Sequence, residues 1–278
     1  MKVKKAIIPV AGLGTRFLPI TKSVPKELLP IVDKPALQYL IEECLESGIE
    51  DIYIVNSPLK KEIESYFKTN EPLENYLKER NKEDLLDKIR GLNNYPLHFL
   101  EQTKPLGSGD AINQASPYIF DEPVAVLFGD DIVKSEVPFL KQLIEVYEKY
   151  SDNVLGIREV PKEQANRYGI AKLEGDRITD IVEKPDIDKA PSNKAVIGRY
   201  ILRPEIFKEL AKIDKNGFEY QITDAINNLR KYQSFYACFL KGEYLDIGSK
   251  DGYVKATISY ALDRDDIKED IKEYIDNL

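Results

Sequence analysis

The first apolar run of the chain leads into a cluster of glycines, a hydroxyl group and cations. Lys5-Ala6-Ile7-Ile8-Pro9 is followed by Val10-Ala11-Gly12-Leu13-Gly14-Thr15-Arg16, and Lys26 comes ten residues later. An apolar run that ends in glycines predicts a strand followed by a loop whose backbone N–H groups another molecule can approach closely. N–H, hydroxyl, guanidinium and ammonium groups in one place favour phosphate as the ligand.

Acidic residues follow another apolar run. Pro123–Phe128 (PVAVLF) predicts a strand and stops on Gly129-Asp130-Asp131. Mg²⁺ takes oxygen ligands and keeps several waters, so acids at the end of a strand are candidate ligands. Acids at this position also commonly do no more than cap a turn, and the two interpretations stay open at this point.

The glycine loop alone is an ambiguous signal, because two glycines after a strand often form only a tight turn. The dinucleotide motif G-x-G-x-x-G would need a glycine where Phe17 stands, and no G-x-x-x-x-G-K-[ST] motif is present. Dinucleotide-dependent dehydrogenases and P-loop proteins are therefore disfavoured.

The whole run from Ala11 to Pro30 is far more specific than its glycines. It reads A-G-L-G-T-R-x-L-P-x-T-K-x-x-P-K-E-L-L-P, which closely resembles the signature of the sugar-1-phosphate nucleotidyltransferases. Its T-K-x-x-P-K-E form is similar to the branch of that family that uses UTP. The resemblance covers nearly the full length and is weakest in the charged stretch Asn70–Gly91, which predicts a solvated helical insertion; a lid or a subunit contact stays open there.

The resemblance implies an activity, a cofactor and a set of site residues. The activity is transfer of the uridylyl group of UTP to α-D-glucose 1-phosphate, giving UDP-glucose and pyrophosphate, with Mg²⁺ as cofactor. The implied residues are Arg16 and Lys26 for catalysis; Ala11, Gly12, Gly14, Thr15, Gln102 and Gly107 for the nucleotide; Gly169, Glu183, Lys184 and Val196 for the sugar phosphate; and Asp130 and Asp246 for the metal. Matching the family's register selects Asp130 and leaves Asp131 as a supporting or turn residue.

The residue types suit these implied roles. Gln102 carries a paired donor and acceptor that can read a base edge. In Val182-Glu183-Lys184-Pro185 an acid that can accept from sugar hydroxyls stands beside a base that can meet a phosphate. Two alternatives remain: a thymidylyltransferase that makes dTDP-glucose and, from a different class, a nucleotide-sugar binding protein without activity.

The elements that must position these residues predict an α/β fold. Helix and strand patterns alternate through the first half, at Pro35–Gly48, Asp51–Asn56, Leu59–Phe67, Pro96–Leu100 and Asp110–Ala115. This order predicts parallel strands with right-handed crossovers, and ligands bind at the carboxyl ends of such strands. We therefore expect a Rossmann-like, open, mixed and mostly parallel sheet flanked by helices.

The second half changes rhythm. After a helix at Pro138–Tyr150 and a strand at Asn153–Val160, alternating strands are predicted at Tyr168–Glu174, Arg177–Glu183 and Ala195–Leu202, as an antiparallel sugar-binding extension of the same sheet. The remaining predictions are a helix within Phe218–Arg230 capped near Thr223 and Asp224, a strand at Ser234–Leu240, a turn at Glu243–Ser249 and a helix at Lys250–Leu262.

No Gly/Ser-rich or Pro-rich linker separates the halves. We therefore expect one domain over residues 1–278, with a nucleotide-binding half (1–150), a sugar-phosphate-binding half (151–262) and a charged C-terminal helix (263–278). That last helix carries Ile267, Ile271, Tyr274 and Ile275 on one stripe, and we expect it to brace the same chain.

The bulk composition narrows the class of protein. A net charge of −8 disfavours non-specific binding to nucleic acid or to a membrane surface. No apolar segment approaches the length of a membrane span, and the amino terminus lacks a cleavable signal pattern, so we expect a cytoplasmic protein. Cys44 and Cys238 read as free structural thiols, and a single histidine excludes a multi-histidine metal site. By resemblance we expect a homodimer or homotetramer.

Overall fold

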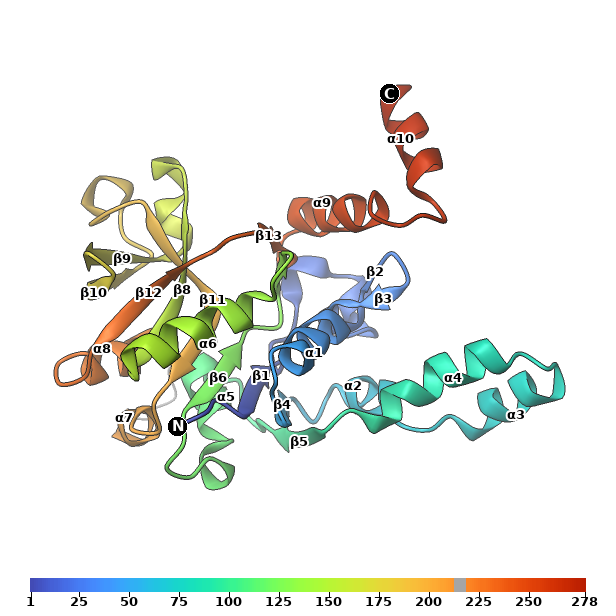
Figure 1. The fold of residues 1–278 in the computed structure, drawn as a ribbon, viewed down its shortest axis with the longest axis horizontal. Coiled ribbons are helices and arrows are strands. Elements are labelled where there is room, and N and C mark those ends of the chain that lie inside the picture. The colour runs from blue at the N-terminus through green and yellow to red at the C-terminus, as the bar shows by residue number, and fades with distance from the viewer. Residues whose placement is uncertain (213–218) are drawn as a thin grey trace.

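The computed structural model describes residues 1–212 and 219–278, and Figure 1 shows their arrangement. Within these residues a nine-stranded sheet runs through the centre of the molecule. Its order is β5 (Leu97–Glu101), β4 (Asp51–Asn56), β1 (Lys5–Pro9), β6 (Val124–Leu127), β11 (Lys194–Leu202), β8 (Asn153–Glu159), β12 (Phe235–Phe239), β10 (Arg177–Glu183) and β9 (Gly169–Glu174).

The sheet divides into a parallel half and a mainly antiparallel half. β1 pairs in parallel with both β4 and β6, so that Ile7 lies opposite Tyr53 on one side and Val126 on the other. β11 is antiparallel to β6 and to β8, and β10 is antiparallel to β9 and to β12, whereas β8 and β12 are parallel. The predicted mixed α/β fold with its antiparallel extension is confirmed.

Helices cover both faces of the sheet and enclose two cores. Successive residues of β1 point to opposite faces: Ala6 and Ile8 join the core under α1 (Ala36–Glu46), α2 (Lys61–Tyr66), α6 (Phe139–Tyr150) and α9 (Lys250–Ala261). Ile7 joins the core under α5 (Ser108–Asn113), α7 (Ile206–Lys212) and α8 (Ile222–Leu229). Cys44 and Cys238 are buried free thiols, as expected. Among the described residues, no helix is long and apolar enough to span a membrane.

The charged insertion forms a hairpin of α3 (Glu71–Glu79) and α4 (Glu83–Gly91) that extends away from the sheet (Figure 1). Leu77 and Leu86 are buried between the two helices, and Arg90 Nε donates to Glu74 Oε2 at 2.8 Å. The insertion is therefore helical and solvated on its outer faces, as predicted.

The prediction that the C-terminal helix braces the chain is wrong. α10 (Lys268–Asp276) has no buried residue and projects beyond the end of α9 (Figure 1). Tyr274 is 65% exposed and Ile275 39% exposed. The amphipathic stripe was read correctly, but a stripe does not specify what covers it.

Two short ribbons were not predicted. β2 (Pro30–Ile31) pairs with β3 (Lys34–Pro35), and β7 (Asp131–Lys134) pairs antiparallel with β13 (Glu243–Asp246). Asp131, the first residue of β7, therefore lies opposite Asp246, the last residue of β13. The predicted turn at Glu243–Ser249 begins as a strand. α7 was also missed. Phe218, where the predicted approach to α8 begins, lies outside the described residues.

Candidate active site

The glycine loop leaves the carboxyl end of β1 and turns through three short 3₁₀ helices, at Thr15–Phe17, Ile20–Lys22 and Lys26–Leu28. Gly14 has φ +64°, and a Cβ there would stand 3.2 Å from Thr21 Cγ2 and 3.3 Å from Lys26 Cβ. Thr21 Oγ1 also donates to the Gly14 carbonyl at 2.9 Å. Gly14 thus permits the turn that brings the loop back against Lys26. Gly12 differs, since no atom lies within 4 Å of where its Cβ would stand.

Lys26 reaches from this loop to the end of β6. Its Nζ lies 2.7 Å from Asp130 Oδ2. Burial alone would lower the pKa of Lys26, but Asp130 and Glu27 outweigh it and raise that pKa. Burial alone would raise the pKa of Asp130, but the Lys26 ammonium outweighs it and lowers that pKa. Both groups are therefore held in their charged forms.

Asp130, Asp246 and Arg16 converge around Gly248. A Cβ on Gly248 would stand 2.8 Å from Asp130 Oδ2, 3.1 Å from Asp246 Oδ1 and 3.3 Å from Arg16 Nη1. The Ile247 N–H donates to the Asp130 carbonyl at 3.0 Å, which joins the two acidic segments directly. The two aspartates, more than a hundred positions apart in the sequence, thus meet beside the cationic loop.

The Asp246 carboxylate is held differently from its neighbour. Burial, and then the charge of Asp130, raise the pKa of Asp246, while the N–H of Gly248 donates to Asp246 Oδ1 at 2.9 Å. Two carboxylates placed together repel each other, and a cation between them would relieve that repulsion.

The chemistry of this donor set fits Mg²⁺. Across residues 1–212 and 219–278, no three acidic, histidine or cysteine side chains gather as a ready-made metal cluster. Mg²⁺ is usually bound through one or two carboxylates plus water and substrate phosphates, and does not need such a cluster. Asp130 and Asp246 supply the two carboxylates.

A buried ion pair lies behind the glycine loop. Lys60 Nζ lies 2.9 Å from Glu27 Oε2 and donates to the Val10 carbonyl at 2.7 Å. Burial raises the pKa of Glu27 and lowers that of Lys60, because it opposes charge on both groups. The pair ties the start of the loop at Val10 to the segment that carries Lys26.

A cavity of about 250 Å³ opens on the nucleotide side of this centre. Among the predicted nucleotide residues it is lined by Ala11, Gly12, Gln102 and Gly107, together with Lys26 and Asp130. Thr15 is placed elsewhere: it lines a separate cavity of about 340 Å³ beyond the loop, with Lys22 and Lys60. Gly14 serves the turn.

Gln102 lines the nucleotide-side cavity and is held by two hydrogen bonds. Its Nε2 donates to the Gly107 carbonyl at 3.1 Å and to Asp110 Oδ2 at 2.9 Å. Gly107 has φ +94°, and a Cβ there would stand 2.3 Å from the Tyr220 carbonyl. Glycine is therefore required at 107, because any side chain there would collide with the Tyr220 backbone.

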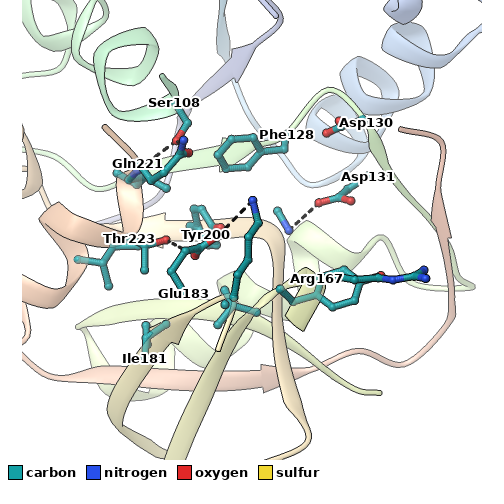
Figure 2. Close-up of a pocket in the computed structure, with 17 residues that line it drawn as sticks. Ser108, Phe128, Asp130, Asp131, Arg167, Ile181, Glu183, Tyr200, Gln221 and Thr223 are labelled. Carbon is teal, nitrogen blue, oxygen red and sulfur yellow. Dashed lines mark hydrogen bonds and ion pairs between the residues drawn. The ribbon is translucent and has the colours of Figure 1, made fainter. Parts of the chain in front are cut away.

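A second cavity of about 250 Å³ opens on the sugar side, and Figure 2 shows its lining. All four predicted sugar-phosphate residues, Gly169, Glu183, Lys184 and Val196, line it. Both cavities include Asp130, Phe128, Ser108 and Gln221 in their linings, so they meet at the metal-ligand candidate.

Glu183 and Lys184 present polar groups to the sugar-side cavity. Thr223 Oγ1 donates to Glu183 Oε2 at 3.0 Å, and Figure 2 shows both side chains facing the same space. A Cβ on Gly169 would stand 3.1 Å from Glu183 Oε2, so glycine leaves room for that carboxylate. Lys184 has φ +44°, and its Nζ lies 3.9 Å from Glu183 Oε1, which is a loose, exposed ion pair.

Several cavity residues were missed by sequence reasoning. Ser108 Oγ donates to Gln221 Oε1 at 2.8 Å and accepts from the Ile222 N–H at 3.1 Å, which joins the starts of α5 and α8. Phe128 packs edge to face with Tyr200 at 5.7 Å between ring centroids. Ser108 directly follows the predicted residue Gly107, and Phe128 stands two positions before the predicted residue Asp130. Gln221 and Thr223 carried no sequence signal for a site.

Known proteins are similar to this chain over most of its length. The family model described as nucleotidyl transferase matches residues 5–262. A protein of Staphylococcus epidermidis named UTP–glucose-1-phosphate uridylyltransferase is 46% identical over 100% of this chain and 99% of its own length.

Two solved structures are also similar over most of the chain. A UTP-bound UGPase from Acinetobacter baumannii has a TM-score of 0.90 at 37% identity and covers 99% of each chain. A UDP-glucose pyrophosphorylase complexed with UDP-glucose has a TM-score of 0.83 at 41% identity, covering 94% of this chain and 100% of that one.

Proposed function

The chain belongs to the nucleotidyl transferase family, and from that premise we propose how its site carries out one reaction. The enzyme transfers the uridylyl group of UTP to α-D-glucose 1-phosphate and releases pyrophosphate. The observation that carries this proposal is the junction of two cavities at Asp130, with the Lys26 ammonium 2.7 Å from that carboxylate. One cavity suits the nucleotide and the other the sugar phosphate.

UTP binds with its base toward Gln102 and Gly107 and its phosphates toward Gly12 and Lys26. A phosphate oxygen of glucose 1-phosphate then attacks the α-phosphorus in line, one P–O bond forms, and the bond to the departing pyrophosphate breaks. The two substrates supply every atom of the products, so no covalent intermediate is needed. Positioning and neutralisation of charge account for reactions of this kind.

The cations divide the phosphate charge between them. Lys26, a point charge held beside Asp130, neutralises charge that grows on the α-phosphate. Arg16 is permanently cationic and forked, which suits the β- and γ-phosphates that leave as pyrophosphate. Thr15, which lines a separate cavity, has no part in this arrangement. When bound, Mg²⁺ held by Asp130 and Asp246 would screen the two anionic phosphates that must come into contact.

Glu183 and Lys184 select and hold the second substrate. Glu183, oriented by Thr223, accepts hydrogen bonds from ring hydroxyls, and Lys184 meets the sugar phosphate. Backbone at Gly169 and Val196 lies against the ring. An exposed ion pair as loose as that of Glu183 and Lys184 costs little to separate, so both groups are available to a ligand.

The decisive experiment mixes the purified protein with UTP, glucose 1-phosphate and Mg²⁺ and measures pyrophosphate and UDP-glucose. Stoichiometric formation of both products is expected. Parallel reactions with dTTP separate the uridylyl activity from a thymidylyl activity, and dTTP as the better substrate would overturn the nucleotide assignment. Silence with every nucleotide would favour a binding protein without activity.

The cellular setting extends the proposal. We place the enzyme in the cytoplasm, where nucleoside triphosphates and sugar phosphates are formed, and we propose a homodimer or homotetramer. The exposed stripe of α10, which has no buried residue, supports association with a further chain. Light scattering of the purified protein measures the number of subunits directly.

A further inference from the structure

Asp131 has no role in the reaction as described, yet it contacts two further strands, β13 and β11. It begins β7, directly after Asp130, and lies opposite Asp246 in the ribbon with β13. Its Oδ1 accepts from the Tyr244 hydroxyl, and its Oδ2 accepts from the Gly198 N–H at 2.8 Å. Both carboxylate oxygens are thus engaged by donors of the protein.

The contact with Gly198 fixes the sugar side of the site. The register of β11 against β8 shifts between Val196 and Tyr200, which marks a bulge that contains Gly198. A Cβ on Gly198 would stand 2.3 Å from Asp131 Oδ2 and 2.6 Å from Phe128 Cβ. The bulge therefore packs directly on Asp131, and it sets where Val196 faces the sugar-side cavity.

The contact with Tyr244 fixes the second metal-ligand candidate. Tyr244 and Asp246 are two positions apart on β13, so their side chains lie on the same face of that strand. The Arg158 guanidinium lies 4.1 Å from the centroid of the Tyr244 ring, and Arg158 Nη2 also donates to the Tyr168 hydroxyl at 3.0 Å. The guanidinium therefore packs over the Tyr244 ring, and the Tyr244 hydroxyl has a defined position at Asp131.

A second arrangement supports β7 from behind. The Arg199 guanidinium donates to the Asp131 carbonyl at 2.7 Å and forms a buried ion pair with Glu43 of α1, with Nη2 2.8 Å from Glu43 Oε2. Glu43 Oε1 in turn accepts from the Leu140 N–H at the start of α6. The backbone at Asp131 is consequently anchored to two helices, while its carboxylate holds Tyr244 and Gly198.

From these contacts we propose that Asp131 is a positioning residue, which holds the β13 strand of Asp246 and the β11 bulge of the sugar side in register with Asp130. The inference rests on the proposed function, because in that function Asp130 and Asp246 share a cation. The two hydrogen bonds of Asp131 have separate effects. The bond from Tyr244, the Tyr244 arm, serves the metal site, and the bond from Gly198, the Gly198 arm, serves the sugar site.

The test uses Tyr244→Phe and Asp131→Ala. Tyr244→Phe removes only the Tyr244 arm. Mn²⁺ serves as the probe, and its binding in the presence of UTP is followed by electron paramagnetic resonance. The affinity for Mn²⁺ should fall by about tenfold, the usual loss for a residue behind a metal ligand. Its KM for glucose 1-phosphate should stay at the parent value. Asp131→Ala removes both acceptor oxygens, so both Mn²⁺ affinity and that KM should worsen.

The matched control is Tyr66→Phe, which also removes one hydroxyl, donated to Gln38 Oε1 at 2.8 Å, from a half-buried tyrosine outside the site. It should change neither quantity, and UTP binding without metal should be unchanged in all three variants. Parent-like Mn²⁺ binding by Tyr244→Phe would overturn the inference, as would equal loss of metal, sugar and metal-free UTP binding in both test variants. A parent protein that releases no pyrophosphate would instead refute the proposed function.

Discussion

The two halves of the site each contain a Glu–Lys pair, and the pairs are built in opposite ways. In the nucleotide half, Glu27 and Lys60 are 2.9 Å apart with side chains 0% and 8% exposed. In the sugar half, Glu183 and Lys184 are 3.9 Å apart with side chains 39% and 63% exposed. The first pair is enclosed by protein, whereas the second borders the sugar-side cavity.

Under the proposed function, this difference separates a charge pair that shapes a site from one that binds a ligand. Lys60 donates hydrogen bonds to Glu27 and to the Val10 carbonyl. The pair therefore holds the glycine loop in place before any ligand binds. Glu183 and Lys184 hold each other weakly and keep donors and acceptors for a substrate. The nucleotide half is therefore preorganised by ion pairing, and the sugar half keeps its polar groups available.

Breaking the enclosed pair should give the largest effect. Lys60→Met leaves the buried Glu27 without its partner, so the free energy of unfolding should fall by about 3 kcal/mol or more. Urea unfolding measures this change. Removing both charges in Lys60→Met/Glu27→Gln should restore much of the loss, because no unpaired buried charge then remains. A single variant as stable as the parent would contradict the structural role of the pair.

Removing the cation that faces the reaction should give the next largest effect. Lys26→Ala should lower kcat by about 10²-fold, the usual loss for an electrostatic stabiliser of the transition state, while the protein stays folded. Steady-state kinetics with saturating UTP and glucose 1-phosphate measure kcat. Lys68→Ala, which removes an exposed lysine paired with Glu64, is the control and should turn over normally. Near-normal turnover by Lys26→Ala would remove Lys26 from the mechanism.

The same contrast explains which parts of the site the sequence could predict. Lys26 and Gly107 lie in short segments that follow parallel strands, so local pattern and the direction of the strands were enough to place them. The join between Ser108 and Gln221 spans 113 positions, and the β11 bulge at Gly198 depends on strand register. Neither is encoded in a local pattern, because both depend on which strands and helices become neighbours.

The β7–β13 ribbon was missed for the same reason. Asp131 and Asp246 each stand in a short segment that reads as a turn, and only their pairing makes strands of both. The outcome for α10 shows the converse: Tyr274 and Ile275 belong to a correctly predicted apolar stripe, but within the described part of the chain both are exposed.

The exposed lysine should affect binding and leave stability unchanged. Lys184→Met should raise the KM for glucose 1-phosphate by about tenfold, because one charge-assisted contact to phosphate is lost, while the KM for UTP stays constant. Its free energy of unfolding should change by less than about 0.5 kcal/mol. Lys172→Met, an exposed position on β9, is the matched control for the kinetics. A loss of stability like that of Lys60→Met would erase the distinction between the two pairs.

Two threonines sharpen the comparison at its finest scale. Thr223→Val removes the hydroxyl that donates to Glu183 at 3.0 Å, and Thr21→Val removes the one that donates to the Gly14 carbonyl at 2.9 Å. Each loses a single hydrogen bond worth about 1 kcal/mol. The first should raise only the KM for glucose 1-phosphate, by about two- to fivefold, and the second only the KM for UTP. If either variant changed both KM values equally, the two halves would bind as one unit, and the separation inferred from their ion pairs would not hold.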